Sequence, residues 1–468
     1  MVEYENYSYC PQIFNERFPS HWKITPIYGL AKEKKISDCT DLELLSVYLN
    51  IGVIPFSYKA EKRTNVTSVD LSKYQRVDPG DFVLNNQQAW RGSVGVSRYT
   101  GIISPAYIVL EMDDCNNSEF MNYMLRSHTM VDQYVINSKS VGSIQRNIHW
   151  ISLKRTYVPI PPRTEQDQIV RFLDWKVSEI NKLIGIRRKE IQKLEELKSC
   201  IIDKFVIHGL HGNFENHNDD IRWEIDYPSN WKIERLRNLF TFRKGLSITK
   251  ANLEPTGIPV ISYGQVHSKK NSMVGLNNEL FRYVNPSYLI TDPSALVQKG
   301  DFIFADTSED LGGSGNCAYI DREEKIFAGY HSVIAHTKEG TDNKYFAYLF
   351  KSPTWRYQIW KKVNAVKVYS ITQQILKDTF LLVPSKEEQQ EIVDYLDNVC
   401  SKIDSLIANT HKNIEELIEM KSVVVSDVVT GKIDVRHVTI PEYEHVDDVT
   451  DNDSDNDNEA AEAGEEEG

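Results

Sequence analysis

The chain has 468 residues, of which 41% are apolar, and it carries a formal net charge of -13 at pH 7. This length is about three times that of a common single domain, so more than one buried core is expected. No apolar run approaches the roughly 20 residues of a membrane-spanning helix, and the six cysteines include no Cys-x-x-Cys pair. We therefore expect a cytoplasmic protein with reduced cysteines and no membrane partner.

The first predicted domain covers residues 1–160. Short runs of β-branched and aromatic residues alternate there with Gly, Pro, Asn and Asp, as in VDPGDFVLNNQ and GIISPAYIVLE. Such runs are typical of short strands joined by tight turns. We therefore predict a strand-rich α+β domain.

A long helix is predicted next, over residues 161–209. It opens with PPRTEQDQIVRFLD, in which the two prolines cannot extend a helix backwards and Thr164 with Asp167 has the spacing of a capping box. Apolar residues then recur at heptad spacing, and Gly209 is a favourable residue just beyond a helix end. This helix should contain about 42 residues and be roughly 60 Å long.

The second half of the chain repeats the first. YPSNWKI answers an earlier FPSHWKI, VQKGDFIFADT answers VDPGDFVLNNQ, and PSKEEQQEIVDYLD repeats the helix start with an offset of 223 residues. Ser385 with Glu388 again resembles a capping box, and Gly431 again marks a helix end. We therefore predict a second strand-rich domain over 210–383 and a second long helix over 384–432.

The two predicted helices carry matching apolar stripes. Both stripes are interrupted by polar residues at corresponding places, which are Arg187 and Lys198 in the first helix and Thr410 and Lys421 in the second. A helix with one apolar stripe needs a partner, so we predict that the two helices form a coiled coil whose polar positions fix the register. The predicted helix seam consists of Leu173, Ile180, Ile184, Ile191, Leu194, Leu396, Ile403, Ile407, Ile414 and Leu417.

The chain is predicted to end in an acidic disordered tail over residues 433–468. Residues 441–468 hold thirteen of the 67 Asp and Glu residues and no Lys or Arg, which leaves 54 acidic against 54 basic residues elsewhere. A segment of this composition has almost nothing apolar to bury and repels itself. The net negative charge therefore comes from the tail and does not exclude a nucleic-acid partner for the folded part.

Motifs for catalysis are incomplete in this sequence. The run NPSY at 285–288 lacks the second proline of the Asn-Pro-Pro-Tyr motif of adenine methyltransferases, and the glycines at 312–315 do not lie in a βαβ pattern. No nucleotide-binding phosphate loop and no Gly-x-Ser-x-Gly elbow occur. The segment HGLHGNFENH at 208–217 lacks the ligand spacing of zinc sites. We predict a non-catalytic protein without a metal site.

Loops of both predicted domains combine amide, basic and aromatic residues. Asn and Gln side chains pair with adenine, Arg pairs with guanine, and Lys and Ser bind phosphates. This combination favours double-stranded DNA as the partner. The candidate DNA-binding residues are Asn86, Gln87, Gln88, Trp90, Arg91, Ser143 and Arg146 in the first domain, and Tyr263, Gln265, Lys269, Lys270, Lys367 and Tyr369 in the second.

The chain resembles the specificity subunits of type I restriction-modification systems. The resemblance covers nearly all of residues 15–435 and rests on the two Pro-then-Glu-Gln helix entries, on VVTGKI at the end of the second helix, and on the runs GIISPAYIVLE and GIPVISYGQVH. It implies two target-recognition domains separated by two long antiparallel helices, related by a pseudo-twofold internal repeat. The end of the first helix, IHGLHG, departs from the family pattern, and so does the acidic tail.

The resemblance also implies a function and partners. Each domain would read one half of a split DNA target, and the helices would set the distance between the halves. Two modification (methyltransferase) subunits with S-adenosylmethionine, and restriction subunits that use ATP and Mg, would bind this chain, which would itself hold no cofactor. A second interpretation of the repeat is a coiled-coil scaffold whose globular domains bind other proteins.

Overall fold

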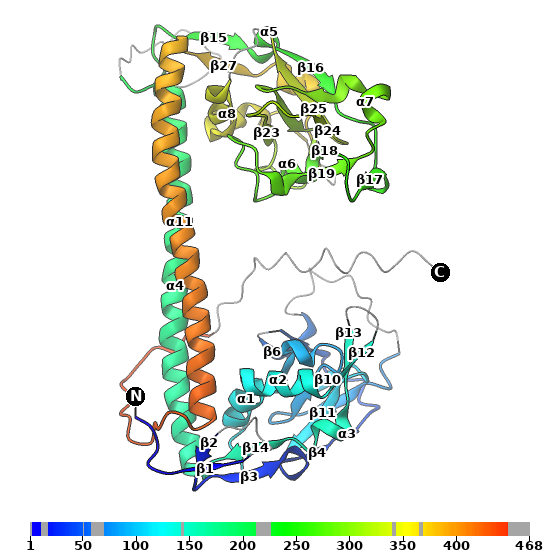
Figure 1. Cartoon of the computed structure of the whole chain (residues 1–468), viewed down its shortest axis with the longest axis vertical. Coiled ribbons are helices and arrows are strands. Elements are labelled where there is room, and N and C mark those ends of the chain that lie inside the picture. The colour runs from blue at the N-terminus through cyan, green and yellow to red at the C-terminus, as the bar shows by residue number, and fades with distance from the viewer. Residues whose placement is uncertain are drawn as a thin grey trace. The chain divides into compact units, whose positions relative to one another are not determined.

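A computed structural model of the chain describes residues 2–10, 17–49, 51–57, 70–141, 145–211, 226–338, 343–364 and 368–447 (Figure 1). The chain divides into two compact units, Met1–Lys189 with His411–Gly468 and Glu190–Thr410. Each unit holds one globular domain and one end of each of two long helices, α4 (Arg163–His208) and α11 (Lys386–Val429). Within the described ranges, no helix is long and apolar enough to span a membrane.

The globular domain of the first unit is built on an antiparallel sheet. Its strands lie in the order β4 (Ala31–Glu33), β11 (Ile108–Met112), β8 (Phe82–Leu84) and β9 (Val94–Val96). Further elements of this unit are β1 (Tyr7–Tyr9), β2 (Arg17–Pro19), β3 (Lys23–Pro26), η1 (Ile27–Gly29), β5 (Leu45–Tyr48), β6 (Gly52–Pro55), β7 (Gln75–Val77), η3 (Ala89–Arg91), β10 (Gly101–Ile103), α1 (Ser118–Arg126), α2 (His128–Ile136), β12 (Ser138–Val141), β13 (Gln145–Ile148), α3 (Trp150–Leu153) and β14 (Tyr157–Ile160).

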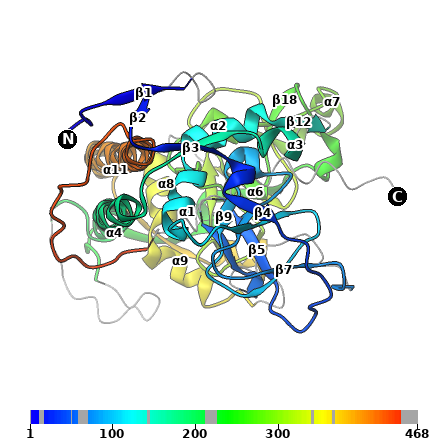
Figure 2. The same ribbon diagram turned by 90° about the horizontal axis from the view of Figure 1, so that it is seen from below.

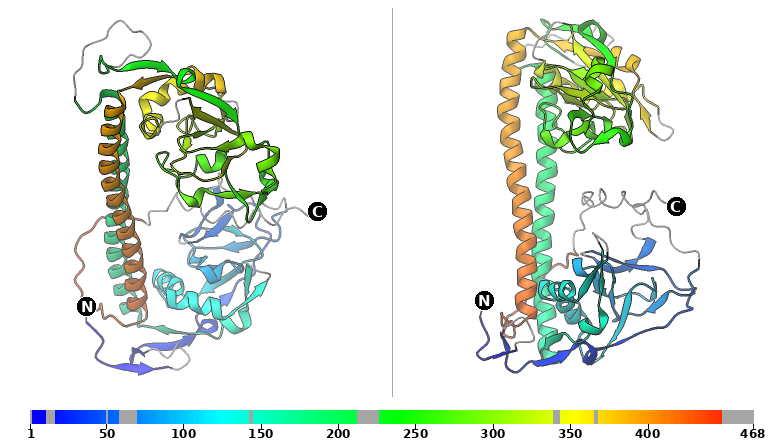
Figure 3. Two further views of the ribbon diagram at one scale, coloured as in Figure 1. Left: turned by 45° about the horizontal axis from the view of Figure 1, so that its top comes forward. Right: turned by 45° about the vertical axis from the view of Figure 1, so that its right-hand side comes forward.

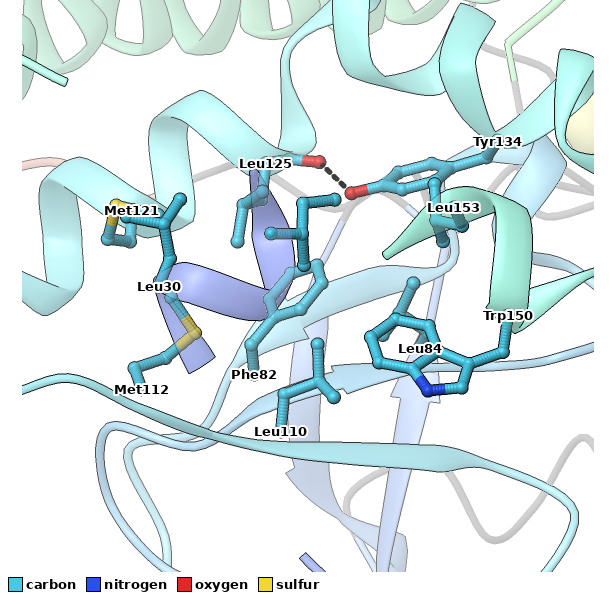
Figure 4. Close-up of a pocket in the computed structure, with 11 residues that line it drawn as sticks. Leu30, Phe82, Leu84, Leu110, Met112, Met121, Leu125, Tyr134, Trp150 and Leu153 are labelled. Carbon is cyan, nitrogen blue, oxygen red and sulfur yellow. Dashed lines mark hydrogen bonds between the residues drawn. The ribbon is translucent and has the colours of Figure 1, made fainter. Parts of the chain in front are cut away.

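The core of this first domain is apolar. Phe82, Met121 and Tyr134 are at most 1% exposed, and they line a small pocket together with leucine and methionine side chains (Figure 4). The Tyr134 hydroxyl donates a hydrogen bond to the Leu125 carbonyl at 2.7 Å, which satisfies the polar end of this buried ring. Burial also raises the pKa of Tyr134 above its usual range. The pocket is therefore a feature of core packing.

The globular domain of the second unit repeats the sheet of the first. The strands β16 (Phe240–Lys244), β25 (Ser332–Thr337), β21 (Phe302–Ala305) and β23 (Cys317–Tyr319) lie in an order that matches β4, β11, β8 and β9. The prediction of two strand-rich α+β domains is confirmed. A second sheet has the order β17 (Leu253–Glu254), β19 (Arg282–Val284), β18 (Ile258–Ile261), β24 (Ile326–Ala328) and β20 (Leu296–Val297). Further elements are β15 (Lys232–Arg235), α5 (Leu236–Leu239), η4 (Lys250–Asn252), α6 (Tyr263–Val266), η5 (Asn278–Leu280), α7 (Tyr288–Thr291), η6 (Pro293–Ala295), β22 (Thr307–Ser308), α8 (Lys344–Lys351), α9 (Pro353–Trp360), β26 (Tyr369–Ser370), α10 (Gln373–Lys377) and β27 (Phe380–Val383).

Each domain is closed by a strand pair at the entry to its long helix. The repeated Trp-Lys-Ile runs lead into β3 and β15, which pair with β14 and β27 respectively. In the register, Lys23 faces Ile160 and Lys232 faces Val383. Because α4 and α11 each begin three residues after the closing strand, this pair fixes where the helix leaves the domain.

The helices α4 and α11 lie side by side (Figures 1 and 2), and the coiled-coil prediction is confirmed. They contain 46 and 44 residues. In the first unit, Leu173 near the start of α4 shares a core with Val428 near the end of α11. In the second unit, Val206 near the end of α4 shares a core with Leu396 near the start of α11. The helices therefore run antiparallel.

The predicted seam positions differ in depth. Most of them are buried, whereas Leu194, Ile407 and Leu417 are half-buried. The buried seam residues are Leu173, Ile180, Ile184, Ile191, Leu396, Ile403 and Ile414.

Two of the predicted register positions make contacts across the helix pair. The Lys421 ammonium donates to Asn181 Oδ1 at 3.3 Å in the first unit, and the Lys198 ammonium donates to Asp404 Oδ1 at 2.5 Å in the second. Facing residues of an antiparallel helix pair keep a constant sum of residue numbers. This sum is 602 for both pairs, so the helices keep the same register in both units. Thr410 instead donates to the Leu406 carbonyl of its own helix at 2.9 Å.

The helix ends agree with the predictions, and one of the two starts does not. Gly209 and Gly431 follow the helices with φ values of 69° and 77°, a conformation that glycine adopts without a steric penalty. At the start of α11, Ser385 Oγ accepts from the Glu388 amide at 3.2 Å. The capping box predicted at Thr164 is wrong, because α4 already begins at Arg163.

The repeated Gln and Asp residues of the helix entries anchor each helix to its own domain. Gln166 donates to the Pro161 carbonyl at 2.9 Å, and Gln389 donates to the Pro384 carbonyl at 3.0 Å. Eight residues further on in each helix, the carboxylate of Asp174 accepts from the Tyr123 hydroxyl at 2.8 Å, and that of Asp397 accepts from the Tyr348 hydroxyl at 2.7 Å. The repeated motif is therefore an attachment device. Figure 3 shows α1, which carries Tyr123, next to α4.

A buried carboxylate organises the start of α4. The side chain of Glu165 is 5% exposed, and it accepts hydrogen bonds from the Tyr4 hydroxyl at 2.6 Å and the Trp22 indole at 3.0 Å. Its second oxygen lies 2.7 Å from His21 Nε2. Burial, together with this carboxylate, raises the pKa of Tyr4 above its usual range. The N-terminal segment is thereby tied to the helix start.

The tryptophan of each domain also packs against the glycine that follows the other long helix of its unit. A Cβ on Gly431 would lie 3.1 Å from the Trp22 ring, and one on Gly209 would lie 3.0 Å from the Trp231 ring. The two units differ at the indole nitrogen. Within the described residues, Trp231 Nε1 is buried without a hydrogen-bond acceptor, although Glu388 occupies the position that corresponds to Glu165.

The start of the disordered tail was predicted too early in the chain, at residue 433. Val435 is fully buried, and its carbonyl accepts from the Gln168 amide at 3.0 Å. The Val446 carbonyl accepts from the Asn181 amide at 3.0 Å. Residues 433–447 therefore lie along α4 and pass beside it in Figure 2. Composition misled here because the acidic residues are concentrated beyond this stretch, whereas the valines of 433–447 have apolar and amide partners. Residues 448–468 lie outside the described part.

The hydrogen bonds that Glu165 accepts from Tyr4 and Trp22 can be tested by mutation. The substitution Glu165→Ala should lower the local unfolding free energy at β3 and the start of α4 by about 3 kcal/mol, because it leaves buried donors without an acceptor. Hydrogen exchange at these amides measures this quantity. The matched substitution Glu388→Ala in the second unit should cost less, since Trp231 does not donate to it. Equal losses for both substitutions would contradict the assigned role of Glu165.

A second prediction concerns pH. Burial raises the pKa of Asp174, although the Tyr123 hydroxyl partly opposes the shift. The folded protein holds the proton of this carboxyl more tightly than the unfolded chain does, because ionising the buried group is unfavourable. The unfolding free energy therefore falls as the pH rises through the folded-state pKa. Asp174→Asn keeps an acceptor for Tyr123 and removes this loss, so its unfolding midpoint should fall less than that of the unaltered protein as the pH rises from 4 to 7. Thermal unfolding at several pH values measures the effect, and parallel pH profiles would contradict it.

Candidate nucleic-acid interface

The candidate interface in each domain is built on a shared backbone connection. The loop that follows β8 is joined to the end of β13 by hydrogen bonds from the Ile148 amide to the Asn86 carbonyl at 3.2 Å and to Asn86 Oδ1 at 2.9 Å. The loop that follows β21 is joined to the segment after β26 by a bond from the Ile371 amide to the Asp306 carbonyl at 2.8 Å. Asn86 and Asp306 occupy equivalent places after the Asp-Phe repeat, and so do Ile148 and Ile371 relative to the long helices. The connection is therefore part of the duplicated frame.

In the first domain this frame carries a tryptophan whose ring two arginines contact. The Trp90 indole donates to the Gln87 carbonyl at 3.0 Å, which fixes the ring on η3. The guanidinium carbons of Arg91 and Arg146 lie 4.9 and 5.8 Å from the Trp90 ring centroid. Such cation–π contacts orient the two guanidinium groups on one ring. We call Gln87, Trp90, Arg91 and Arg146 the first cluster.

The other predicted residues of the first domain have different positions. Asn86 uses its side-chain oxygen for the Ile148 amide and so supports the loop. Gln87 is exposed and Gln88 is half-buried. Ser143 lies outside the described residues. The structure therefore brings Arg146 of the β12–β13 hairpin to the Trp90 loop, although more than fifty residues separate them in the sequence.

In the second domain the same frame carries tyrosine and histidine rings. Tyr263 on α6 lies 5.6 Å from Tyr330 and 5.5 Å from His331, measured between ring centroids, with both pairs close to edge-to-face. The His331 Nδ1 atom lies 3.2 Å from Asp306 Oδ1. Burial, with the neighbouring Tyr263, raises the pKa of Tyr330. We call Tyr263, Tyr330, His331 and Asp306 the second cluster.

A half-buried arginine holds the loop beside the second cluster. Arg356 donates to the Gly312 carbonyl at 2.9 Å and to the side-chain oxygen of Asn316, and burial lowers the pKa of its guanidinium. Asn316 Nδ2 lies 3.1 Å from His267 Nδ1, and His267 Nε2 lies 2.7 Å from the Thr307 carbonyl. The Asn316 amide donates to Nδ1 and the Thr307 carbonyl can only accept, so the neutral His267 ring carries its proton on Nε2. The glycines at 312–315 thus serve a structural loop.

Three predicted residues of the second domain are engaged in local structure. Gln265 Oε1 accepts from the Ser262 amide at 3.1 Å in a capping box, and Lys270 forms a 2.7 Å ion pair with Glu279. Tyr369 lies on β26, opposite Ser308 of β22. Lys269 is exposed, and Lys367 lies outside the described residues.

Sequence reasoning missed Asp306, His331, Asn316 and Arg356. The signal for Asp306 was the repeat itself, since this residue stands where the first domain has Asn86. The run NPSY forms a turn, because Asn285 Oδ1 accepts from the Ser287 amide at 3.0 Å. No group of three or more potential metal ligands occurs in the part of the chain that the structure describes.

The chain matches the family described as the type I restriction modification DNA specificity domain, over residues 36–196 and again over 228–417. It is 22% identical over 439 residues to the type I restriction enzyme MjaVIII specificity subunit of Methanocaldococcus jannaschii, across 90% of this chain and 95% of that protein. It is also 22% identical over 350 residues to the EcoKI specificity subunit of Escherichia coli K12, across 71% of this chain and 70% of that protein.

The fold is similar to that of a solved chain. That chain belongs to a structure described as the structural basis underlying complex assembly and conformational transition of the type I R-M system. The TM-score is 0.62 at 15% sequence identity, and the match covers 89% of this chain and 100% of that chain.

The first cluster makes a prediction for DNA binding. Trp90→Ala removes the ring that orients Arg91 and Arg146, so it should weaken binding to target DNA by about tenfold, whereas Trp90→Phe keeps an aromatic face and should lose less. Fluorescence anisotropy with a labelled duplex measures the affinity, and thermal unfolding checks that both variants fold. An unchanged affinity of Trp90→Ala would contradict a DNA-binding role for the first cluster.

Proposed function

Since the chain belongs to the type I restriction-modification DNA specificity family, we propose that it binds a bipartite DNA target with one recognition domain for each half-site. It is the specificity component of such a system and not its catalytic part. The observation that carries the proposal is that one duplicated frame supports two different clusters. A common frame sets a similar approach to DNA, and different side chains on it read different bases.

The two clusters differ in the chemistry that they offer to DNA. Arg146 in the first domain corresponds in the repeat to Tyr369 in the second. Two guanidinium groups beside a flat ring favour guanine edges or phosphates, whereas tyrosine and histidine rings offer single hydrogen bonds and apolar faces. We therefore propose that the two half-sites have unrelated sequences.

Modification and restriction subunits are the proposed protein partners, and S-adenosylmethionine, ATP and Mg would be bound by them in the cytoplasm. The long helices offer apolar residues for such contacts. On α4 in the first unit, Leu183 and Ile186 are 49% and 51% exposed, and on α11 Met420 and Val423 are 48% and 50% exposed. Exposed apolar residues on a helix pair are typical of protein-binding surfaces. A coiled-coil scaffold without DNA binding would use the same residues, so DNA binding decides between the two functions.

Co-expression with type I modification subunits, followed by mapping of methylated adenines, tests the proposal. The expected result is a methylated motif with two specific parts separated by a nonspecific spacer. Replacing residues 1–160 by the corresponding domain of another specificity subunit should change one half of this motif and leave the other unchanged. A change in both halves would contradict independent reading, and a pure scaffold would direct no specific methylation.

The helices are proposed to set the spacer. Removing one heptad from each helix, residues 187–193 and the opposite residues 409–415, preserves the register of the Asn181–Lys421 and Lys198–Asp404 pairs. A heptad is roughly 10 Å long, so the preferred spacer should shorten by about three base pairs. The methylation motif of the shortened protein measures the spacer, and an unchanged spacer would contradict the role of the helices.

A further inference from the structure

We propose that His331 contacts a base edge of the DNA and determines the sequence preference of the second recognition domain. The inference rests on the proposed function of that domain. His331 lies in the turn between β24 and β25, where its side chain is 59% exposed.

The backbone of His331 points to a functional role for its side chain. Its φ is 53°, in the left-handed region that residues with a Cβ rarely adopt. Of the two other such residues in the described part, Met273 is 6% exposed and gains apolar packing, and Asp38 is an exposed residue of a type that tolerates this conformation. The exposed side chain of His331 gains no comparable burial that would offset the strained backbone. Residues held in strained backbone conformations cluster at functional sites.

Neighbouring groups restrict the direction of the imidazole. Asp306 Oδ1 engages Nδ1 at 3.2 Å, and the rings of Tyr263 and Tyr330 lie 5.5 and 6.1 Å away at interplanar angles of 79° and 77°. Within the described residues, no hydrogen bond joins Nε2 to the protein. Nε2 is therefore the ring nitrogen that can meet a ligand, and its orientation is set before binding.

The position also belongs to the interface and is specific to the second domain. The Asp306 carbonyl accepts from the Ile371 amide, so the residue that orients His331 is part of the duplicated frame. In the sheet register Phe82 pairs with Leu110 and Phe302 pairs with Ala335, which makes Ala106 the counterpart of His331. Alanine cannot form a side-chain hydrogen bond. The contact should therefore affect the second half-site alone.

The test uses the full-length chain assembled with modification subunits and a DNA library that is random in both half-sites. Glycine adopts the left-handed conformation without a steric penalty, so His331→Gly should fold with an unchanged or higher unfolding midpoint. It should lose about tenfold in selectivity at one or two base pairs of the second half-site. The first half-site should be unchanged. Ala106→Gly is the matched control, and it should alter neither half-site.

A conservative variant separates base reading from other roles. His331→Asn also tolerates the left-handed conformation, but asparagine pairs with adenine. It should therefore shift the preference at the same base pairs towards adenine. If the complex that contains His331→Gly methylates the same motif with unchanged selectivity, the inference is wrong. A uniform loss of affinity for all sequences would indicate a phosphate contact and would also overturn it. If the unaltered protein directs no two-part motif, the proposed function fails instead.

Discussion

The close packing of a tryptophan, a helix start and a helix end is the constraint on which each unit depends. Trp22 packs against Gly431 and donates to Glu165, so one side chain joins the domain to both long helices of the first unit. Trp231 packs against Gly209 in the second unit. A residue with a Cβ would crowd the indole ring at both positions, would clash with Pro19 at position 431, and would also be strained at a positive φ. The repeated tryptophan and the glycines after the helices are therefore parts of one device.

This device makes the frame constant and leaves the loops free to differ. The paired strands β3 with β14 and β15 with β27 end where the helices begin, and the Gln and Asp residues of the helix entries bind the domain that precedes them. None of these contacts involves the loops that carry the two clusters. Loops on a rigid scaffold can change their side chains without changing the core, which suits a protein that must read different DNA sequences.

The two clusters also show that residue type alone does not tell whether a side chain is available to bind DNA. Asn86 and Gln265 have side chains suited to base recognition, but both are engaged by backbone amides of the protein. Arg91 and Arg146 gain a common direction from Trp90. The residues best suited to meet DNA are those whose direction is set by neighbours while a polar group stays exposed.

The sequence by itself determined the features that have a local or periodic cause. Heptad spacing and the glycines at 209 and 431 predicted the two helices, and the internal repeat predicted two similar strand-rich domains, because periodicity and backbone preference act over a few residues. Tertiary structure alone decided the contacts between distant segments. It brought Arg146 to Trp90, placed Asp306 beside His331 and laid residues 433–447 along α4. Such contacts depend on strand register and on the direction of each side chain, which composition and spacing do not encode.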